Sequence, residues 1–133
     1  MAQIIITAHI DCLSDVMEFV EGEMHGANID KTKQTNIQIA VEEIFVNIAG
    51  YAYLSGEGDV TVSISVDPEK ISLEFSDCGE HYNPLAKEDP DISLSVEDRE
   101  PGGLGIFMIK QLMDEIKYEH RDGHNILTVC KYI

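Results

Sequence analysis

Apolar residues follow two different periodicities along the first half of the chain, and these predict a strand followed by two helices. Residues 3–10 are rich in β-branched side chains, which is typical of a strand. The residues that follow place apolar side chains on one helical face behind a cap at Asp11, and Gly22 and Gly26 indicate where this helix ends. The second helix extends to about Tyr53 and has the clearest helical stripe, made by Ile37, Ala40, Val41, Ile44, Phe45 and Ile48.

The second half of the chain predicts two hairpins with a helix between them. Residues 60–66 and 71–75 alternate between apolar and polar side chains, and the sequence DPEK joins them through a turn. Helical spacing returns over about residues 104–115. Two further strands, residues 116–120 and 125–132, then flank a turn with the sequence RDGH.

A long segment without periodicity separates the first hairpin from the last helix. It covers about residues 78–103 and contains three of the four prolines of the chain. Loops of this length inside a compact domain are usually lids or binding loops. The element order strand–helix–helix–strand–strand–loop–helix–strand–strand predicts an α+β fold, a two-layer α/β sandwich.

The composition narrows the classes of protein to consider. The 133 residues carry a formal net charge of −16, which argues against a nucleic-acid partner, and 44% of them are hydrophobic, too many for a disordered acidic tail. The sequence has no apolar run of membrane-spanning length, and its start does not have the pattern of a signal peptide. Cys12, Cys78 and Cys130 are odd in number and without zinc spacing, which suits a reducing compartment. We therefore expect one cytoplasmic domain over residues 1–133, with no membrane partner.

The first candidate for chemistry is a pair of polar residues on the second predicted helix. Glu43 and Asn47 are four residues apart, so both side chains lie on the same helical face. A glutamate can accept a proton or orient a nucleophile, and an asparagine oxygen is a suitable ligand for Mg²⁺. Taken alone, the pair favours a simpler interpretation, in which Glu43 is solvated and Asn47 only fills a helical position.

The second candidate is the sequence SDCG at the end of a predicted strand. Asp77 follows the strand and Gly79 allows the chain to turn sharply, so the carboxylate can face a pocket. There it could accept a hydrogen bond from an exocyclic amine such as that of adenine. An ordinary Asx turn with no ligand is the alternative interpretation.

The third candidate is the sequence PGGLG at the start of the last predicted helix. Gly102, Gly103 and Gly105, with Leu104 between them, would let backbone N–H groups approach an anion at a helix N-terminus. The segment lacks the pattern of a P-loop, and no parallel βαβ unit surrounds it as a dinucleotide fingerprint requires. A helix start joined to a flexible loop would give the same sequence.

The order and spacing of the three motifs resemble the GHKL superfamily of ATPases and kinases, and in particular the small serine kinases that act as anti-sigma factors. The resemblance spans the chain from residue 3 to the last strand, and it is carried by the segments AVEEIFVNIAGYAY, FSDCGEHYNPL and GGLGIFMIKQLMDEIKYEH. It implies a Bergerat-type ATP-binding fold, with a mixed, mostly antiparallel sheet covered by helices on one face.

The resemblance also implies a role for each motif residue. Asn47 would coordinate the Mg²⁺ that bridges the ATP phosphates, and Glu43 would be the general base or would orient the nucleophile. Asp77 would bind the adenine amine, and Gly79 would permit close approach of the base. The phosphates would lie against the start of the last helix, at Gly102, Gly103, Leu104 and Gly105.

The ATP lid would be the loop of about residues 84–102. Arg99 lies in this lid and could reach the terminal phosphate, where a cation would offset developing charge. The alternative is that Arg99 pairs with its acidic neighbours Glu97 and Asp98.

The chain departs from the family pattern at two places. Tyr51 stands where many members have a histidine or lysine, and Glu80 and His81 occupy positions that are usually small, although Tyr82 supplies the expected aromatic residue. These departures put the nucleotide affinity and the kinase activity in question.

The function implied by the resemblance is that of an ATP- and Mg²⁺-dependent serine/threonine kinase. Such a kinase would bind a sigma factor and phosphorylate an anti-sigma antagonist protein. Two alternatives are a nucleotide-gated binding module of the same fold, slightly favoured by Tyr51, and the ATP-binding domain of a histidine kinase. We rank the histidine kinase lower because the chain opens directly with a strand. An exposed first strand would suit a homodimer, and the acidic field would favour a partner with a basic surface.

Overall fold

The predicted order of elements is confirmed in the computed structural model, which describes residues 1–53, 57–86 and 104–133. Two short 3₁₀ segments, Ile10–Cys12 and Pro84–Ala86, accompany the main elements. The main helices and strands are β1 (Ala2–Thr7), α1 (Leu13–Met24), α2 (Lys31–Tyr51), β2 (Asp59–Val66), β3 (Lys70–Asp77), α3 (Leu104–Leu112), β4 (Glu115–Arg121) and β5 (His124–Tyr132).

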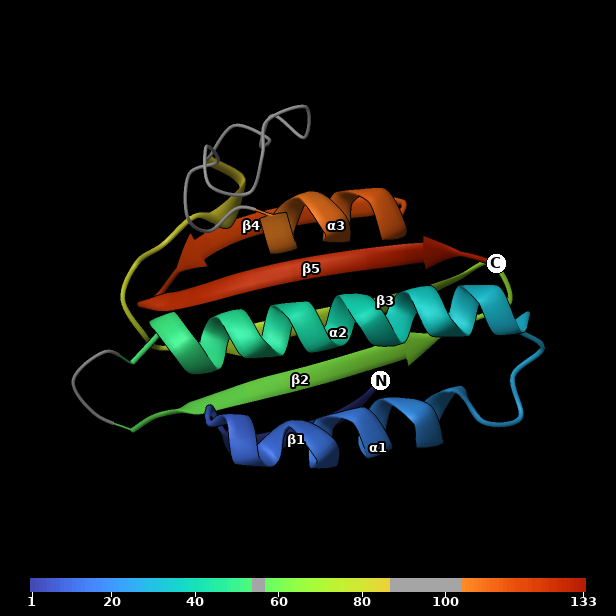
Figure 1. The fold of residues 1–133 in the computed structure, drawn as a ribbon, viewed down its shortest axis with the longest axis horizontal. Coiled ribbons are helices and arrows are strands. Elements are labelled where there is room, and N and C mark those ends of the chain that lie inside the picture. Colours follow the sequence, from blue (N-terminus) through green and yellow to red (C-terminus); the bar gives the residue numbers. More distant parts are fainter. Residues whose placement is uncertain (54–56, 87–103) are drawn as a thin grey trace.

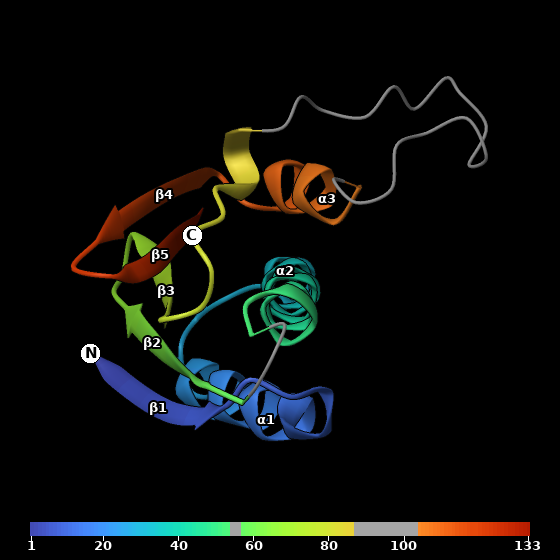
Figure 2. The same ribbon diagram turned by 90° about the vertical axis from the view of Figure 1, so that its left-hand side faces the viewer.

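The strands form one five-stranded sheet in the order β1-β2-β3-β5-β4, and the three helices lie on one face of it (Figures 1 and 2). The α+β sandwich is therefore confirmed. The sheet itself is antiparallel in all the strand pairs of the described residues, rather than mixed. The reason is that α1 and α2 together return the chain to the end where β1 finishes, whereas a single crossover helix would have produced a parallel pair.

The core lies between the helices and the inner face of the sheet. Alternate strand residues point inward, so that Val62 of β2 pairs with Phe75 of β3, and Phe75 pairs with Leu127 of β5. These side chains pack against the apolar stripe of α2. The stripe predicted from the sequence is buried at Ile37, Ala40, Val41, Ile44 and Phe45.

The start of α1 differs from the sequence prediction. Asp11 does not cap this helix, because β1 already ends at Thr7 and the 3₁₀ segment follows. The Asp11 N–H donates to Nδ1 of His9, and α1 begins after Cys12 without a side-chain cap. Gly22 lies inside α1 and does not end it, whereas Gly26 follows the end of the helix with a φ of +86°.

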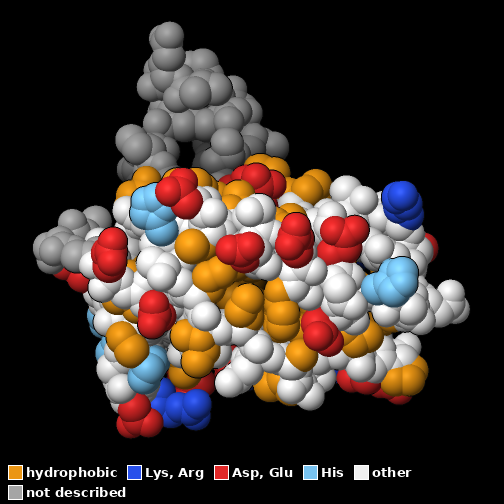
Figure 3. Space-filling model, turned by 90° about the horizontal axis from the view of Figure 1, so that it is seen from below, with side chains coloured by type: hydrophobic (Ala, Val, Ile, Leu, Met, Phe, Trp, Pro, Cys, Tyr) orange, Lys and Arg blue, Asp and Glu red, His pale blue; other side chains and the backbone are white. Residues whose placement is uncertain are grey.

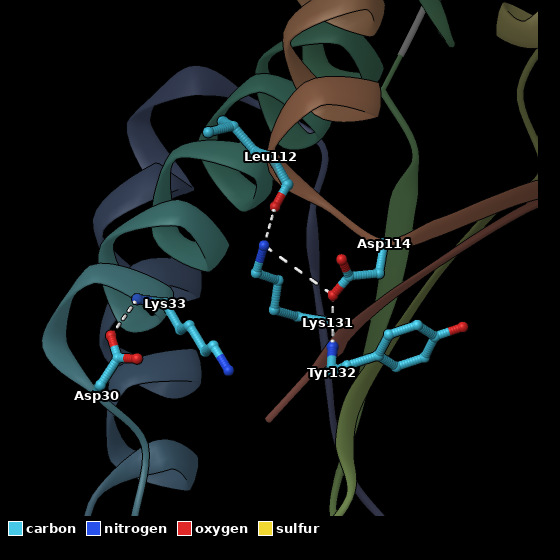
Figure 4. Close-up of polar contacts among 6 residues, drawn as sticks. All are labelled: Asp30, Lys33, Leu112, Asp114, Lys131 and Tyr132. Carbon is cyan, nitrogen blue, oxygen red and sulfur yellow. Dashed lines mark hydrogen bonds and ion pairs between the residues drawn. The ribbon is translucent and has the colours of Figure 1, made fainter.

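Hydrogen bonds that the sequence pattern did not reveal determine where α2 starts and where α3 ends (Figure 4). The Asp30 carboxylate accepts from Lys33 N–H and begins α2, which ends at Tyr51 rather than Tyr53. The α3 helix ends at Leu112, earlier than predicted, because Lys131 Nζ of β5 donates to the Leu112 carbonyl at 2.7 Å. No helix in the described part of the chain combines the length and apolar character needed to cross a bilayer.

Candidate functional site

The predicted motif residues gather at the end of the sheet where β3 finishes and β5 begins. Asp77 is the last residue of β3 and pairs with Asn125 of β5. The C-terminal half of α2 and the first turn of α3 complete the site from the helical layer. Motifs from three distant parts of the sequence therefore meet at one end of the fold.

Asp77 presents a buried carboxylate that is held on one side only. Only 5% of the residue is exposed, and it shares the inward-facing set of β3 with Phe75. Its Oδ1 atom accepts from Gly79 N–H at 2.9 Å and from Asn125 Nδ2 at 3.0 Å. The Oδ2 atom accepts no hydrogen bond from the described residues. Within the described part of the chain, Oδ2 is therefore the carboxylate oxygen that is left for a further donor. An open, fixed acceptor is suited to a ligand amine.

Asn125 is a site residue that the sequence analysis missed. It is 7% exposed and forms hydrogen bonds through both Nδ2 and Oδ1 of its amide. Its Nδ2 also donates to the Glu80 carbonyl at 2.8 Å, and its Oδ1 accepts from the Tyr118 hydroxyl at 2.5 Å and from Tyr82 N–H at 3.3 Å. The sequence did contain one signal for Asn125. It is a polar residue on the face of β5 that points inward, where neighbours such as Leu127 are apolar.

Tyr118 completes this network from β4. Burial raises the pKa of its hydroxyl, and the nearby Asp77 charge raises it further. The hydroxyl therefore stays protonated at neutral pH and remains a donor to Asn125. Asn125, which donates to Oδ1 of Asp77, is thus itself held by Tyr118 and by the Glu80 carbonyl, and this orients the carboxylate.

Gly79 brings the chain after β3 against the end of α2. A Cβ atom at this position would lie 2.2 Å from the Ala52 carbonyl oxygen, so the backbone contact requires glycine. The next residue, Glu80, donates its N–H to the same carbonyl at 2.9 Å. The Asp77 motif is therefore attached directly to the helix that carries Glu43 and Asn47.

Glu43 and Asn47 lie together beside the start of α3. A Cβ atom on Gly105 would be 2.9 Å from Glu43 Oε2 and 3.5 Å from Asn47 Nδ2, which places the first turn of α3 against both side chains. Both residues are half-buried. Ala52 follows Asn47 by five positions, about 8 Å along the axis of α2. The site therefore has two parts, one around Asp77 and one around Glu43, Asn47 and Gly105.

Comparison with known proteins decides the family. Residues 6–131 match the family model described as the histidine kinase-like ATPase domain. The chain belongs to this family. The resemblance to the GHKL superfamily is thereby confirmed for most of the length of this ATPase domain.

Relatives of this ATPase domain are named as protein kinases. It is 27% identical to the serine/threonine-protein kinase BtrW of Bordetella bronchiseptica over 97 residues, 72% of this chain and 68% of that protein. It is 31% identical to the serine-protein kinase RsbW of Bacillus mycoides over 102 residues, 74% of this chain and 63% of that protein. The chain thus covers 63–68% of the length of these two relatives.

A solved structure supports the fold of the ATPase domain. The crystal structure of the RsbU and RsbW domains of Rv1364c from Mycobacterium tuberculosis matches 98% of this chain and 32% of that chain, with a TM-score of 0.62 and 16% identity. The likeness covers the sheet and all three helices, since it extends over nearly the whole chain.

The remaining predicted site residues of the ATPase domain fall into two groups. Arg99, Gly102 and Gly103, with nearly all of the lid of residues 84–102, lie outside the described residues, as do Glu97 and Asp98. Leu104 begins α3, as predicted.

The departures from the family pattern are at the surface. Tyr51 is 64% exposed at the end of α2. Glu80 and His81 are exposed as well, and the His81 ring stacks on that of His120 with centroids 4.0 Å apart.

The phosphate part of the site offers the kind of ligand that Mg²⁺ uses when a nucleotide brings it in. The described residues contain no group of three or more His, Cys, Asp and Glu side chains that could hold a metal ion. Mg²⁺ usually keeps several waters and binds one or two protein oxygens together with substrate phosphates. The amide oxygen of Asn47, on the same helical face as Glu43, fits that requirement.

Proposed function

We propose that this domain binds ATP with Mg²⁺ and transfers the terminal phosphoryl group to a serine or threonine of a partner protein. The observation that carries the proposal is the Asp77 carboxylate, fixed through one oxygen and open at the other. It lies against the end of the helix that carries Glu43 and Asn47. Names of relatives as serine kinases support the same activity.

The Asp77 part of the site selects the base. An adenine presents an amine donor where a guanine presents a carbonyl acceptor. A carboxylate oxygen attracts the amine and repels the carbonyl, so we expect ATP to bind more tightly than GTP. Gly79 would permit close approach of the base, and its lack of a side chain also allows the backbone contact with Ala52.

The α2 and α3 part of the site holds the reacting groups. Asn47 would hold Mg²⁺ through its amide oxygen, and backbone N–H groups from Gly102 to Gly105, including Leu104, would bind the phosphates. Bound Mg-ATP supplies the phosphoryl group and neutralises its developing charge. Glu43 would accept the proton of the incoming hydroxyl at Oε2, the atom nearest to Gly105. Residues 84–102 would form the lid, and Arg99 would reach the terminal phosphate.

The partners in this proposal are a sigma factor and an anti-sigma antagonist protein, in the cytoplasm. The names of the RsbW relatives support a protein substrate. The face formed by α1 and β1 gathers acidic side chains (Figure 3), and α1 exposes Asp15, Glu18, Glu21 and Glu23. Such a face favours a basic partner surface. A homodimer through the sheet edge at β1 is part of the same proposal, since Ile5 on that strand is 62% exposed.

The first experiment measures whether the protein binds the nucleotide. Because a ligand that binds the native state stabilises it, Mg-ATP should raise Tm, and Mg-GTP should raise it less. Purified protein with Mg-ATP and candidate antagonists should then label one of them on a serine. Failure of every nucleotide to change Tm would contradict the proposal.

The Glu43→Ala variant separates a kinase from a nucleotide-gated binding module. A kinase should lose phosphorylation and keep ATP binding, since Glu43 acts on the incoming hydroxyl. A binding module should regulate its partner as before. Glu42→Ala, on the exposed neighbouring position, is the matched control.

A further inference from the structure

Tyr53, just after the end of α2, joins the ends of two strands through a single hydroxyl. The hydroxyl donates to the Asp59 carbonyl of β2 at 2.7 Å and accepts from Cys78 N–H at 2.9 Å. The β2–β3 ladder ends at the pair Val60 and Asp77, so Asp59 and Cys78 would form its next rung. The Tyr53 hydroxyl therefore takes the place of one rung of the ladder.

This substitution explains how the chain leaves the sheet directly after Asp77. If Asp59 and Cys78 paired directly, β3 would continue alongside β2. With a hydroxyl between them, both backbone groups keep a hydrogen-bond partner while β3 turns toward α2. The turn is what brings Gly79 onto the Ala52 carbonyl.

The Tyr53 ring is held in position by the backbone of Gly58. A Cβ atom on Gly58 would lie 2.1 Å from Cε1 of the Tyr53 ring, so the ring lies directly on this glycine. Burial raises the pKa of the Tyr53 hydroxyl, and the nearby Asp77 charge adds to the effect, against the lowering influence of the Cys78 N–H. The hydroxyl is therefore protonated at neutral pH and can donate and accept at once.

Three consecutive backbone N–H groups after Asp77 are fixed in this way. Tyr53 binds that of Cys78, Asp77 Oδ1 binds that of Gly79, and the Ala52 carbonyl binds that of Glu80. Two of the three anchors come from the end of α2. The position of the Asp77 carboxylate is therefore linked to the helix that carries Glu43 and Asn47.

From these contacts we infer that Tyr53 is a positioning residue for the base-binding part of the site: its hydroxyl holds residues 78–80 against α2 so that Asp77 faces the ligand. The inference rests on the proposed nucleotide function. Tyr53 contacts neither the phosphate part of the site nor Asp77 Oδ1 through any hydrogen bond among the described residues.

The test uses the Tyr53→Phe variant with two probes of the site. Loss of the hydroxyl leaves Asp59 O and Cys78 N–H without their partner, so the affinity for Mg-ATP should fall by about tenfold. The affinity for magnesium tripolyphosphate, which reports on the phosphate part alone, should stay within about twofold of the original value. Calorimetry measures both. Tyr132→Phe removes an exposed hydroxyl from the far end of β5 and is the matched control.

A nucleotide-free readout separates this inference from the proposed function. The Cys78 amide should exchange with solvent about tenfold faster in Tyr53→Phe, because its acceptor is gone. Unchanged Cys78 exchange, or equal losses of affinity for ATP and tripolyphosphate, would overturn the inference. If the exchange accelerates while the unmodified protein binds no ATP, the proposed function fails and the anchoring by Tyr53 stands.

A second variant protects the test against a folding defect in Tyr53→Phe. Gly58→Ala keeps the hydroxyl and displaces the ring, since the added methyl group overlaps it. It should also weaken ATP binding more than tripolyphosphate binding. Equal weakening of both ligands would contradict the positioning role.

Discussion

The strands β3 and β5 run side by side and carry polar side chains at both ends, which we call the site end (Asp77 and Asn125) and the turn end (residues 67–70 and 131–133). At the turn end, polar groups complete local backbone structure. Asp67 Oδ1 accepts from the N–H groups of Glu69 and Lys70 at 2.8 and 2.9 Å, and Lys131 closes the last turn of α3. Asp67 itself is exposed.

At the site end the polar groups are buried and organise one another. Asp77 and Asn125 are 5% and 7% exposed, and Tyr118 supports them from the neighbouring strand. Burying such groups costs free energy unless all their hydrogen bonds are made. The turn end therefore uses polar side chains to close loops, whereas the site end uses them to present one carboxylate oxygen.

The largest effect should come from Asp77→Asn. The amide would place N–H groups where the carboxylate accepts the adenine amine, so ATP affinity should fall by about a hundredfold. Calorimetry with Mg-ATP measures the loss. Asp114→Asn, beside the turn end, should leave the affinity unchanged, because the Asp114 carboxylate accepts from Tyr132 N–H and pairs with Lys131, both at the opposite end of β5 from Asn125. If the two variants bound ATP with equal affinity, the assignment of nucleotide binding to the site end would be wrong.

Asn125→Ala should mainly lower stability. The change leaves the Tyr118 hydroxyl, Tyr82 N–H and Glu80 carbonyl without their partner. We expect the free energy of unfolding to fall by about 2–3 kcal/mol. Urea denaturation measures this loss. Thr128→Ala, on the outer face of the same strand, should change it by less than about 0.5 kcal/mol. If both variants lost a similar free energy of unfolding, the hydrogen bonds of Asn125 would not be what stabilises this end of the sheet.

Gly105→Ala should alter activity more than stability. The added methyl group lies 2.9 Å from Glu43 Oε2, so the carboxylate must move. Because Glu43 is the proposed general base, moving its carboxylate should lower the phosphorylation rate by about tenfold. Gly50→Ala has nothing within 4 Å and should keep the rate while adding up to about 1 kcal/mol of stability to α2. A full rate in Gly105→Ala would contradict the role of Glu43.

The smallest effect is expected for Asp67→Ala, and it should depend on pH. Hydrogen bonds from Glu69 and Lys70 N–H hold the pKa of Asp67 below its usual value of 3.8. The stabilisation is therefore present above about pH 4 and is lost as the pH falls through the lowered folded-state pKa. The variant should have a slightly lower Tm at pH 7, and the difference should vanish at about pH 2. A difference that grows on acidification would contradict this account.

Much of the fold followed from local pattern, whereas some helix ends did not. The stripe of α2 and the alternation in β2 and β3 predicted the buried faces correctly. The predicted end of α3 was too late, because a partner distant in sequence, Lys131, binds the Leu112 carbonyl. Local propensity contains no information about such partners.

The candidate site also contains residues that local sequence patterns identify and residues that they do not. Glu43, Asn47, Asp77, Gly79 and Gly105 form recognisable motifs, and the structure brings them to one end of the fold. Their roles remain predictions. Asn125 and Tyr53 belong to no such motif. Their contacts depend on the pairing of β3 with β5 and on the early end of the β2–β3 ladder, which only the assembled sheet determines.

The bond from Lys131 to the Leu112 carbonyl has a mechanical consequence. It ties the C-terminal end of α3 to the strand that also carries Asn125, whereas Gly105 at the other end lies over Glu43 and Asn47. A helix held at one end moves most at the other, so we expect a tilt of α3 to displace Gly105 more than Leu112. Such a tilt would change the surroundings of Glu43 and Asn47 more than those of Asn125.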